Sequence, residues 1–415
     1  MNIAVMGSGG REHTIAWKLS QDSNVDKVYT IPGNGGTDNN VSLDINNFEA
    51  IKIFCTENGI ELLFVGPEAP LAAGIVDYFE DTGIKVFGPD KEAAKLEGSK
   101  IYAKNFMTKY NVKTAEFEIF ENDKNPDELI RKLNGNLVVK YDGLAAGKGV
   151  FVCSSVEEAH ESIKSLKTKY GNNVRYIVEQ KLTGQEISII GFTDGKSIKL
   201  LLPSQDHKPA YDGDKGPNTG GMGAFCPVPF CDENLIQKIY NNAVNPTLNG
   251  IRNENLNYRG VIYFGLMVDN NDPYVLEYNV RLGDPETEVI LPALKSSLLE
   301  LILACYDDSL DSVDIAFNDG YFVDVVLASG GYPGAYEKQF EIDGLEDVDT
   351  DCLVFHAGTK RDGSNVYTYG GRVINVVCQA DDLQSAINKV YENVKKISFK
   401  NCFYRNDIGS KGISR

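Results

Sequence analysis

Glycine clusters at the ends of short apolar segments constrain the fold of this chain more than any other feature. Residues 2–6, 25–31 and 62–65 have the apolar character of strands, and each runs directly into a loop rich in glycine or proline. Residues 11–20 between them show helical spacing of apolar side chains. Strands that alternate with helices build a parallel sheet, whose ligands gather at the carboxyl ends of the strands. We therefore predict a parallel α/β domain over residues 1–95 with a ligand site at these loops.

The first glycine loop, from Gly7 to Gly10, fits a dinucleotide-binding fingerprint only in part. Glu12 stands where the G-x-G-x-x-G pattern has its third glycine, and the second strand ends without an acidic residue for a ribose hydroxyl. The sequence therefore disfavours a nicotinamide cofactor. Two interpretations remain: backbone N–H groups at the helix start bind a small anion, or the glycines only make a tight turn.

The charge balance excludes several classes of partner. The 415 residues include 41 Lys and Arg against 59 Asp and Glu, which gives a formal net charge of −18. A general nucleic-acid binder needs a basic face, and an anionic membrane attracts basic segments, so we expect neither partner. Hydrophobic residues make up 42% of the chain without a run of 18, so we predict a globular protein with no spanning helix.

Cysteine and histidine are too sparse to build a fold around metal ions or disulfides. Eight cysteines are spread along the chain without a C-x-x-C pair, and four histidines occur. We therefore expect no disulfide framework and no zinc site, which fits a reducing compartment. The first residues enter a strand without the pattern of a signal peptide, so we expect a cytoplasmic location.

A second glycine loop follows a predicted strand that ends at Lys140. Gly143 and Gly147 enclose three residues, and Gly149 follows Lys148 where a Walker P-loop needs Ser or Thr, so this is not a P-loop. A strand ending in lysine, a glycine loop and a returning strand predict a small lid that folds over phosphate groups, with the two lysines as point charges. The alternative is a mobile surface hairpin.

Glu277, Asn279 and Arg281 are spaced two apart along the predicted strand 275–278 and just beyond it. Residues two apart on a strand point to one face. A carboxylate and an amide oxygen suit Mg²⁺, which keeps waters and phosphate oxygens in its other positions. An arginine on the same face could bind a transferring phosphoryl group. The alternative is a strand edge with solvated charges.

The long polar loop over residues 205–223 is the remaining candidate. Structureless loops of this length inside a compact domain are usually functional. His207 is either a general base or a satisfied loop histidine, and both interpretations stay open. Cys226 and Cys231 have no His and Asp that would complete a nucleophile arrangement, so we expect them to be small buried hydrophobic residues.

Together these motifs resemble the ATP-grasp superfamily, and within it the phosphoribosylamine–glycine ligase (glycinamide ribonucleotide synthetase) family. The superfamily likeness rests on Lys140 before the lid loop, on Glu179 to Leu182 after a strand, and on Glu277-x-Asn279-x-Arg281. The family likeness covers essentially the whole chain. Its motifs lie at residues 7–13, 32–34, 66–71, 96–100, 142–149, 204–208, 216–223, 281–287, 355–359, 370–373 and 407–409.

The resemblance implies an α/β (α+β overall) ATP-grasp fold with an N-terminal Rossmann-like parallel-sheet domain, a small mobile lid domain and a C-terminal α/β domain. The expected segments are an N-terminal domain over 1–95, a connector over 96–120, the lid (B) subdomain over 121–187, the central (A) subdomain over 188–318 and the C-terminal domain over 319–415. Helical patterns predict helices at 100–109, 156–170 and 383–396.

The resemblance also implies a reaction. ATP, glycine and 5-phospho-β-D-ribosylamine would give ADP, phosphate and N1-(5-phospho-β-D-ribosyl)glycinamide through a glycyl phosphate intermediate, a step of de novo purine (IMP) biosynthesis. The implied metal cofactor is Mg²⁺ or Mn²⁺, the partners are these small molecules, and the chain would be a monomer or a weak homo-oligomer. Two alternatives remain: another ATP-grasp carboxylate–amine ligase or carboxylase, and a non-catalytic nucleotide-binding regulator. The set of Glu277, Asn279 and Arg281 argues against the regulator.

Site residues follow from the resemblance by matching position. The implied ATP-binding residues are Lys104, Lys140, Gly143, Gly147, Lys148, Gly149, Glu179, Lys181, Leu182 and Glu186. The implied substrate contacts are Gly9, Arg11, Asn34, Glu68, Gly283 and Pro285. Glu277 and Asn279 would bind the metal; Arg281 would stabilise the transferring phosphoryl group, and Asp212 and Asp284 would orient glycine and the amine. Because these substrates carry carboxylate or phosphate groups, the acidic excess is expected on the outer surface.

Overall fold

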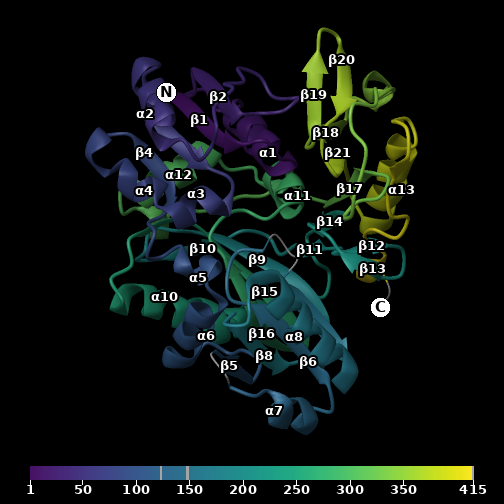
Figure 1. Cartoon of the computed structure of the whole chain (residues 1–415). Coiled ribbons are helices and arrows are strands. Elements are labelled where there is room, and N and C mark those ends of the chain that lie inside the picture. The colour runs from purple at the N-terminus through teal and green to yellow at the C-terminus, as the bar shows by residue number, and fades with distance from the viewer. Residues whose placement is uncertain (122–123, 146–148, 414–415) are drawn as a thin grey trace.

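The structure, a computed structural model, describes residues 1–121, 124–145 and 149–413. Figure 1 shows the N-terminal body at the upper left, the C-terminal body at the upper right, and the lid with the strands that follow it below. Among the described helices, none has the length and apolar character needed to span a bilayer.

The N-terminal body is built on parallel strands, as predicted. Its strands pair in the order β2-β1-β3-β4, and every pairing among them is parallel. The strands are β1 (Asn2–Gly7), β2 (Lys27–Pro32), β3 (Ile60–Val65) and β4 (Lys85–Pro89). The helical elements of this body and the connector are α1 (Gly10–Leu19), α2 (Phe48–Glu57), α3 (Glu68–Ala73), α4 (Ile75–Tyr78), η1 (Glu80–Thr82), α5 (Lys95–Gly98) and α6 (Lys100–Lys109).

Alternation along β1 explains why this sheet is buried on both faces. Ile3 and Val5 belong to one apolar cluster, whereas Ala4 and Met6 belong to another, and all four side chains are buried. Successive side chains of a strand point to opposite faces, so a continuous apolar run requires cover on both sides. The short apolar segments of the sequence are therefore parallel strands of one sheet, with β1 and β3 in its interior and β2 at its end, and their carboxyl ends carry the glycine loops.

The same sheet continues into the strands that carry Glu277 and Asn279. β4 pairs antiparallel with β15, and the complete order is β10-β9-β15-β4-β3-β1-β2, with β16 paired to β15. The added strands are β9 (Gln185–Thr193), β10 (Ile198–Leu200), β15 (Tyr258–Asp269) and β16 (Asp272–Asn279). The accompanying helical elements are α9 (Glu233–Ile239), η2 (Tyr240–Val244), α10 (Asn245–Asn253), α11 (Glu286–Ala293), α12 (Leu298–Tyr306) and η3 (Leu310–Ser312).

The lid is a separate four-stranded antiparallel sheet with its own apolar core. Its strands β5 (Phe117–Phe120), β6 (Asn136–Tyr141), β7 (Val150–Ser154) and β8 (Tyr176–Gln180) pair in the order β5-β8-β6-β7. Helices α7 (Asp127–Lys132) and α8 (Val156–Tyr170) complete it. Leu137 and Val139 of β6 pack with Ala159 and Ile163 of α8 in one buried cluster, so the lid has an apolar core of its own.

The C-terminal body takes strands from two distant parts of the chain. Its six-stranded sheet has the order β11-β14-β17-β21-β18, with β22 on β17. The strands are β11 (Gln205–Asp206), β14 (Gly223–Cys226), β17 (Tyr321–Ser329), β18 (Cys352–His356), β21 (Arg372–Ala380) and β22 (Cys402–Phe403). This body also contains η4 (Leu345–Asp347), α13 (Leu383–Val394) and α14 (Ser410–Ile413). It carries two hairpins, β12 (Pro209–Tyr211) with β13 (Lys215–Asn218), and β19 (Thr359–Asp362) with β20 (Asn365–Thr368). The expected segment 188–318 thus contributes strands to two sheets.

Side-chain caps fix the starts of the predicted helices. The hydroxyl of Ser99 accepts a hydrogen bond from the Tyr102 N–H at the start of α6, and the hydroxyl of Ser155 accepts one from Glu158 at the start of α8. Such caps satisfy N–H groups that have no partner within the helix. The predicted helices 100–109 and 156–170 have these bounds in the structure, and the third predicted helix ends at Val394.

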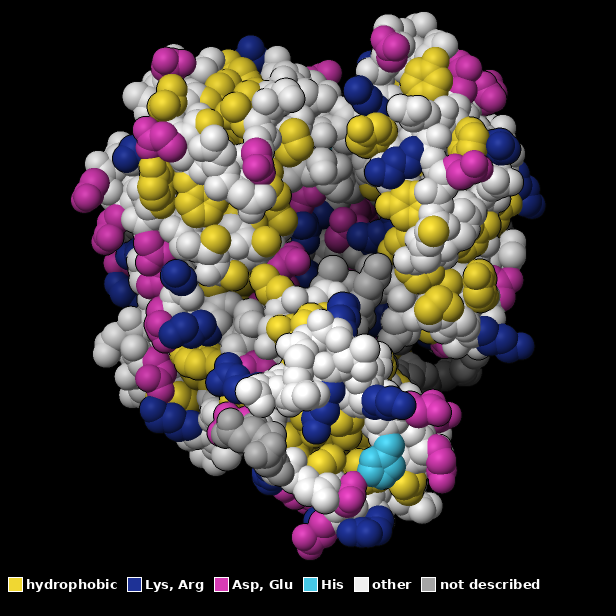
Figure 2. Space-filling view, viewed as in Figure 1, with side chains coloured by type: hydrophobic (Ala, Val, Ile, Leu, Met, Phe, Trp, Pro, Cys, Tyr) yellow, Lys and Arg dark blue, Asp and Glu magenta, His cyan; other side chains and the backbone are white. Residues whose placement is uncertain are grey.

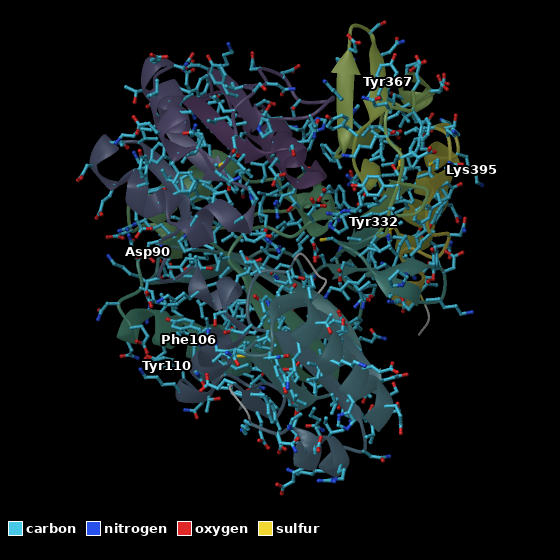
Figure 3. All side chains as sticks on the ribbon, viewed as in Figure 1. Asp90, Phe106, Tyr110, Tyr332, Tyr367 and Lys395 are labelled. Carbon is cyan, nitrogen blue, oxygen red and sulfur yellow. A yellow bond between two sulfur atoms is a disulfide. The ribbon has the colours of Figure 1, made fainter. Side chains whose placement is uncertain are left out.

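Aromatic packing attaches the connector to the strand that carries Glu277. Phe106 of α6 and Tyr110, which follows the helix, are labelled in Figure 3. Their ring centroids lie 5.0 Å apart, and the Phe106 ring lies 6.2 Å from that of Tyr278 on β16. A Cβ atom on Gly250 would lie 2.3 Å from the Phe106 ring, so α10 approaches this cluster closely. The cluster holds α6, and Lys104 on it, beside the end of β16.

One cysteine pair forms a disulfide, although the sequence predicts no disulfide framework. Cys352 on β18 and Cys378 on β21 are directly opposite each other in the antiparallel register, with their Cα atoms 4.7 Å apart, and they form a disulfide. Their separation of 26 residues in the sequence carries no recognisable motif, and only the strand pairing brings them together. The other six cysteines are free.

A half-buried histidine, His13, and a buried one, His356, join the N-terminal body to the C-terminal body. His13 of α1 accepts a hydrogen bond at Nδ1 from the backbone N–H of His356 on β18 (2.8 Å), and the two ring centroids are 5.7 Å apart. Burial lowers the pKa of His13 to about 4 and that of His356 to about 3. Both rings are therefore neutral at neutral pH.

We predict that this histidine pair makes the free energy of unfolding decrease as the pH falls below 7. A histidine whose pKa is lowered by folding contributes stability above its unfolded pKa of about 6.5 and loses it as the pH falls toward the folded value. Between pH 7 and pH 5 the loss should be about 2 kcal/mol per histidine. In urea unfolding at both pH values, the double variant H13N/H356N, which keeps an acceptor near each Nδ1, should lose markedly less stability than the parent. An identical loss in both proteins would contradict this account.

Candidate active site

The candidate site lies in a hollow between the three bodies. Figure 2 shows this hollow at the centre of one face, where basic and acidic side chains lie side by side. The carboxyl ends of β1 and β3 reach it, together with the end of β16 and the turn that follows, as the contacts below show. The site is therefore built from segments that are far apart in the sequence.

Lys104, Lys140 and Glu179 form a buried ionic triad. Lys104 Nζ lies 2.7 Å from Glu179 Oε2, and Lys140 Nζ contacts Glu179 Oε1. Lys104 also donates to Thr114 Oγ1 (2.6 Å), and Lys140 donates to the carbonyl of Leu276 (3.0 Å). The structure thus brings the two predicted phosphate-binding lysines together, one from α6 and one from β6, and leaves the triad with an excess positive charge.

The environment of the triad sets its protonation. Burial opposes the charge of Lys104 more strongly than Glu179 supports it and lowers the pKa of Lys104 to about 8. Burial also opposes ionisation of Glu179, but the two ammonium groups outweigh it and lower the pKa of this carboxyl. A buried charge of this kind is kept only when it is paired, so Glu179 is needed to hold the lysines in place.

The other residues predicted around the nucleotide lie between the end of lid strand β8 and the start of β9. Lys181 follows β8, and its Nζ donates to Ser154 Oγ of β7 (3.0 Å). Glu186 on β9 pairs with Lys208 Nζ (2.9 Å). Leu182 lies between them and is half-buried.

The lid loop begins with a backbone conformation that favours glycine. Gly143 has φ of +153°, and a Cβ atom there would lie 2.8 Å from the Tyr141 ring. Gly149 lies at the other end of the loop, where a Cβ atom would approach Ala145. Gly147 and Lys148, both predicted to contact ATP, lie outside the described residues.

Four basic side chains near Glu277 keep its carboxylate ionised. Burial opposes its charge, but Lys100, Lys208, Lys140 and Arg281 together lower its pKa to about 2. Lys100 and Lys208 were not among the residues predicted for the site; the motifs 96–100 and 204–208 contained them but gave no reason to direct them at Glu277. An ionised carboxylate surrounded by ammonium groups is suited to a divalent cation that arrives with phosphate groups.

Arg281 reaches the end of β16 by a turn rather than by strand register. β16 ends at Asn279, and the pairing with β15 shifts by one residue opposite Gly265 and Leu266. The shift lies before Glu277, so strand alternation applies from Glu277 to Asn279, and Arg281 lies just beyond the strand. Its guanidinium instead turns back and donates to Asn279 Oδ1 (3.0 Å).

Two carboxylates hold the Arg281 guanidinium. Glu97 Oε1 lies 2.9 Å from its NH2 group, and Glu68 Oε2 lies 3.6 Å from its Nε. Glu97 also accepts a hydrogen bond from the backbone N–H of Val280 (2.7 Å), which fixes the turn. Burial raises the pKa of Glu97 despite Arg281, whereas burial of Glu68 is outweighed by Arg281 and Arg11, which lower its pKa. Sequence reasoning missed Glu97, although it lies in the quoted motif 96–100.

Glu12 occupies the centre of the first glycine loop. Its Oε1 lies 2.5 Å from Arg11 Nε, and its Oε2 accepts a hydrogen bond from the Gly9 N–H (2.6 Å). A Cβ atom on Gly7, Gly9 or Gly66 would lie within 3 Å of this side chain. The glycines of two strand ends therefore leave room for a carboxylate, which is the residue that broke the dinucleotide pattern.

Asn34 and Asp284 are adjacent to this loop. Asn34 Nδ2 donates to the carbonyls of Ser8, Gly9 and His356. A Cβ atom on Gly9 would lie 3.0 Å from Asp284 Oδ2, so the loop and the Asp284-Pro285 turn face each other closely.

Arg372 fixes the Asp284 turn. Its NH2 group lies 2.9 Å from Asp284 Oδ1, and its NH1 group donates to the Asp284 carbonyl (2.8 Å). Gly283 precedes this turn, and a Cβ atom there would lie 2.2 Å from Glu286 Oε2. Arg372, known from the sequence only as part of a motif, is thus a structural partner of the predicted catalytic residue.

Asp212 and His207 lie in contrasting environments. Asp212 is exposed, and its carboxylate accepts hydrogen bonds from the backbone N–H and the side chain of Asn406 (2.7 and 2.9 Å). His207 is fully buried, and burial lowers its pKa to about 3, so it is a poor general base at neutral pH.

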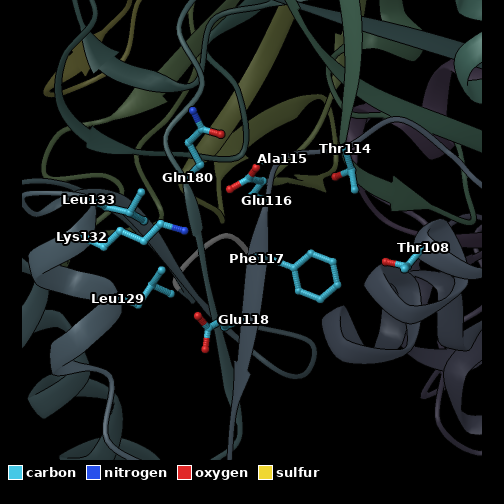
Figure 4. A pocket seen from close by; sticks show the side chains of 10 residues that line it. All are labelled: Thr108, Thr114, Ala115, Glu116, Phe117, Glu118, Leu129, Lys132, Leu133 and Gln180. Atoms are coloured by element: carbon cyan, nitrogen blue, oxygen red, sulfur yellow. The ribbon is translucent and has the colours of Figure 1, made fainter.

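A separate cavity of about 410 Å³ lies at the edge strand β5 (Figure 4). It adjoins the triad, because Thr114 both lines it and accepts the hydrogen bond from Lys104. Its charged lining consists of Lys132 opposite Glu116 and Glu118, which does not suit a polyphosphate. The full lining is Thr108, Thr114, Ala115, Glu116, Phe117, Glu118, Leu129, Lys132, Leu133 and Gln180.

Three family models match the chain. They are described as phosphoribosylglycinamide synthetase N domain, ATP-grasp (A) domain and C domain, and they cover residues 1–97, 98–287 and 322–411. A phosphoribosylamine–glycine ligase from Clostridium acetobutylicum is 45% identical over 99% of both chains. One from Halalkalibacterium halodurans is 44% identical over 100% of this chain and 98% of its own length.

Solved structures give the same result as the family models and the relatives. The crystal structure of phosphoribosylamine–glycine ligase from Thermotoga maritima is 36% identical, covers 98% of this chain and 100% of its own, and superimposes with a TM-score of 0.84. A biotin carboxylase from Campylobacter jejuni, 14% identical over 99% of this chain and 94% of its own, has a TM-score of 0.72 and shares the fold alone.

We predict that the ionic triad is required for stability. Glu179→Gln would leave two buried ammonium groups without a carboxylate, so the free energy of unfolding should fall by about 3–5 kcal/mol in urea titrations. The matched control is Asp308→Asn, which removes an exposed ion pair with Lys196 and should change stability by less than about 1 kcal/mol. Equal effects of the two substitutions would contradict a structural role for the triad.

Proposed function

The chain belongs to the phosphoribosylglycinamide synthetase family of ATP-grasp carbon–nitrogen ligases in de novo purine biosynthesis, and we propose here how its residues perform the reaction. The substrates are ATP, glycine and 5-phospho-β-D-ribosylamine, and the products are ADP, phosphate and N1-(5-phospho-β-D-ribosyl)glycinamide. The observation that carries the proposal is the convergence of Arg281, Glu277 and the lysines of the triad on one hollow.

The chemistry requires an activated carboxylate. Glycine's carboxylate is a poor acyl donor, so it first attacks the γ-phosphate of ATP and forms glycyl phosphate with release of ADP. The ribosylamine nitrogen then attacks the acyl carbon, phosphate leaves, and the amine loses a proton. Neither step needs a covalent bond to the protein, so catalysis consists of positioning and charge stabilisation.

The lid side of the hollow is proposed to bind ATP. Lys104 and Lys140 would contact the phosphates, because their shared carboxylate neutralises only one of two charges. Lys181, Leu182 and Glu186 would border the adenosine, and the loop Gly143–Gly149 would close over the phosphates. Glu179 would act mainly by holding the two lysines.

Mg²⁺ or Mn²⁺ would be held by Glu277 and Asn279. In the described part of the chain, no group of three His, Cys, Asp or Glu side chains is arranged to hold a metal ion unaided. A carboxylate and an amide oxygen fit an ion that takes its other ligands from phosphates and waters. When bound, the ion supplies positive charge to the phosphates, and Arg281 supplies directed hydrogen bonds beside it.

The strand ends of the N-terminal body are proposed to hold the phosphosugar and glycine. Gly9, Arg11, Asn34 and Glu68 would face the ribosylamine, since they surround one loop. Asp284, with Gly283 and Pro285, would orient glycine and the amine, because its Oδ2 faces Gly9. Asp212 would act through the hairpin that carries it.

The division of the chain into segments 1–95, 96–120, 121–187, 188–318 and 319–415 is proposed to separate these tasks. The N-terminal segment would bind the phosphosugar, the lid would cover ATP, and the central segment would hold the metal. We also propose a cytoplasmic location and a monomer or weak homo-oligomer.

ADP release tests the proposed function directly. With ATP and Mg²⁺, steady-state ADP release should require both glycine and phosphoribosylamine, because glycine alone supports at most the single step that forms glycyl phosphate. Replacing glycine with bicarbonate, or the phosphosugar amine with other amines, should stop turnover and so separate this ligase from other ATP-grasp ligases and carboxylases. Turnover without phosphoribosylamine would reject the proposal.

We predict that Arg281→Lys mainly lowers kcat. Lysine keeps the charge but cannot reproduce the fork of hydrogen bonds, so kcat should fall about 10²–10³-fold, whereas KM for ATP should change little. Steady-state kinetics with saturating glycine would measure this. An increase in KM alone would instead show that Arg281 binds ground state and transition state equally.

We predict that Glu277→Gln weakens metal binding. Removing the one ionised ligand should raise the dissociation constant of Mn²⁺ in the presence of ATP by about tenfold or more, measured by electron paramagnetic resonance of free Mn²⁺. Asp272→Asn, on the same strand but paired with Lys113 at the surface, is the control. Unchanged Mn²⁺ binding in Glu277→Gln would contradict the metal assignment.

A further inference from the structure

The hairpin β12–β13 is inserted between two segments that line the hollow. On its first side, Lys208 pairs with Glu186. On its second side, Gly220 and Gly221 accept hydrogen bonds from Arg372 at their carbonyls (3.0 and 3.3 Å). Any movement of the hairpin would therefore be transmitted to both sides of the proposed site.

The two sides are joined at the base of the hairpin. Thr219 donates from its N–H (2.8 Å) and its hydroxyl (2.7 Å) to the carbonyl of Lys208. A Cβ atom on Gly221 would lie 2.3 Å from Pro285 Cδ, and the Gly220 N–H donates to the Tyr332 hydroxyl (3.0 Å); Tyr332 is labelled in Figure 3. The base is thus packed against the Asp284-Pro285 turn.

The hairpin itself is poorly supported. All four residues of β13, Lys215–Asn218, are exposed, and Tyr211 of β12 is 52% exposed. An isolated two-stranded hairpin is marginally stable in water. Its position must therefore come from contacts with another segment.

The C-terminal segment supplies those contacts at the tip. The backbone N–H and Nδ2 of Asn406 donate to the two carboxylate oxygens of Asp212 (2.7 and 2.9 Å). Asp407 Oδ2 accepts a hydrogen bond from the Gly213 N–H (2.8 Å). Lys411 Nζ lies 2.8 Å from Asp214 Oδ2.

Arg405 connects the tip to the rest of the C-terminal body. Its side chain is 1% exposed, donates to the Pro209 carbonyl (3.0 Å) and pairs with Asp214 (3.0 Å) and Asp407 (2.7 Å). Its own carbonyl accepts a hydrogen bond from the Tyr391 hydroxyl of α13 (2.7 Å). A guanidinium offers several donors in fixed directions, which a lysine could not match.

We infer that Arg405 and Asn406 are positioning residues for the ligase reaction. They act through the hairpin: by fixing its tip they hold Lys208 against Glu186 on one side and Gly220–Gly221 against Arg372 and Asp284 on the other. Asp212 then contributes as the acceptor for Asn406 and not as a group that touches substrate. This inference rests on the proposed function.

An exchange of the two side chains tests the inference. Asn406→Asp places two carboxylates together and should lower kcat/KM for glycine at least tenfold. The double variant D212N/N406D restores a donor–acceptor pair with the partners reversed and should recover activity to within about threefold of the parent. If Asp212 instead touches substrate, the double variant will stay as impaired as Asp212→Asn.

Two further measurements separate positioning from mere stability. Asn406→Ala should raise KM for glycine and speed tryptic cleavage after Lys215, while its melting temperature stays equal to that of the control variant. The control is Lys396→Ala, which removes an exposed pair with Asp349 in the same body. Activity and cleavage equal to the control, or a loss explained by a lower melting temperature with unchanged KM, would overturn the inference. An inactive parent chain would instead reject the proposed function.

Discussion

The need to pair every buried charge governs the architecture of the hollow. Arg11 lies against Glu12, Arg281 against Glu97, the two lysines against Glu179, and Arg372 against Asp284. Removing one member of such a pair leaves an uncompensated charge that costs several kcal/mol. A site for anionic substrates in a chain of net charge −18 is therefore built with at least one carboxylate for each cation or pair of cations.

This pairing also explains which residues sequence reasoning missed. The expectation from the substrates was a set of cations, and the motifs supplied them. Glu12 and Glu97 belong to predicted motifs but received no predicted role. Nothing local in the sequence shows that Glu12 pairs with the adjacent Arg11 or that Glu97 pairs with the distant Arg281. Glycine at positions 7, 9 and 66 follows from the same constraint, since the Glu12 side chain fills the space their Cβ atoms would need.

The three bodies meet at polar contacts that depend on the C-terminal sheet. β11 and β14 belong to that sheet although they precede β17 by about a hundred residues, and the hairpin between them rests on residues 405–411. The His13–His356 bond joins the same sheet to α1. The last part of the chain thus completes one side of the hollow rather than forming an appended domain.

The sequence by itself determined the parallel strands with their glycine ends, the helices 100–109 and 156–170, and the family, because periodicity, caps and motifs are local properties. Only the tertiary structure decided that Glu179 is shared by two lysines, that Arg281 turns back onto Asn279, and that Asp212 is bound by Asn406. The Cys352–Cys378 pair also appeared only there. These contacts join residues separated by 26 to 194 positions or lie beyond a strand end, where neither register nor helical spacing fixes a side chain and only long-range packing does.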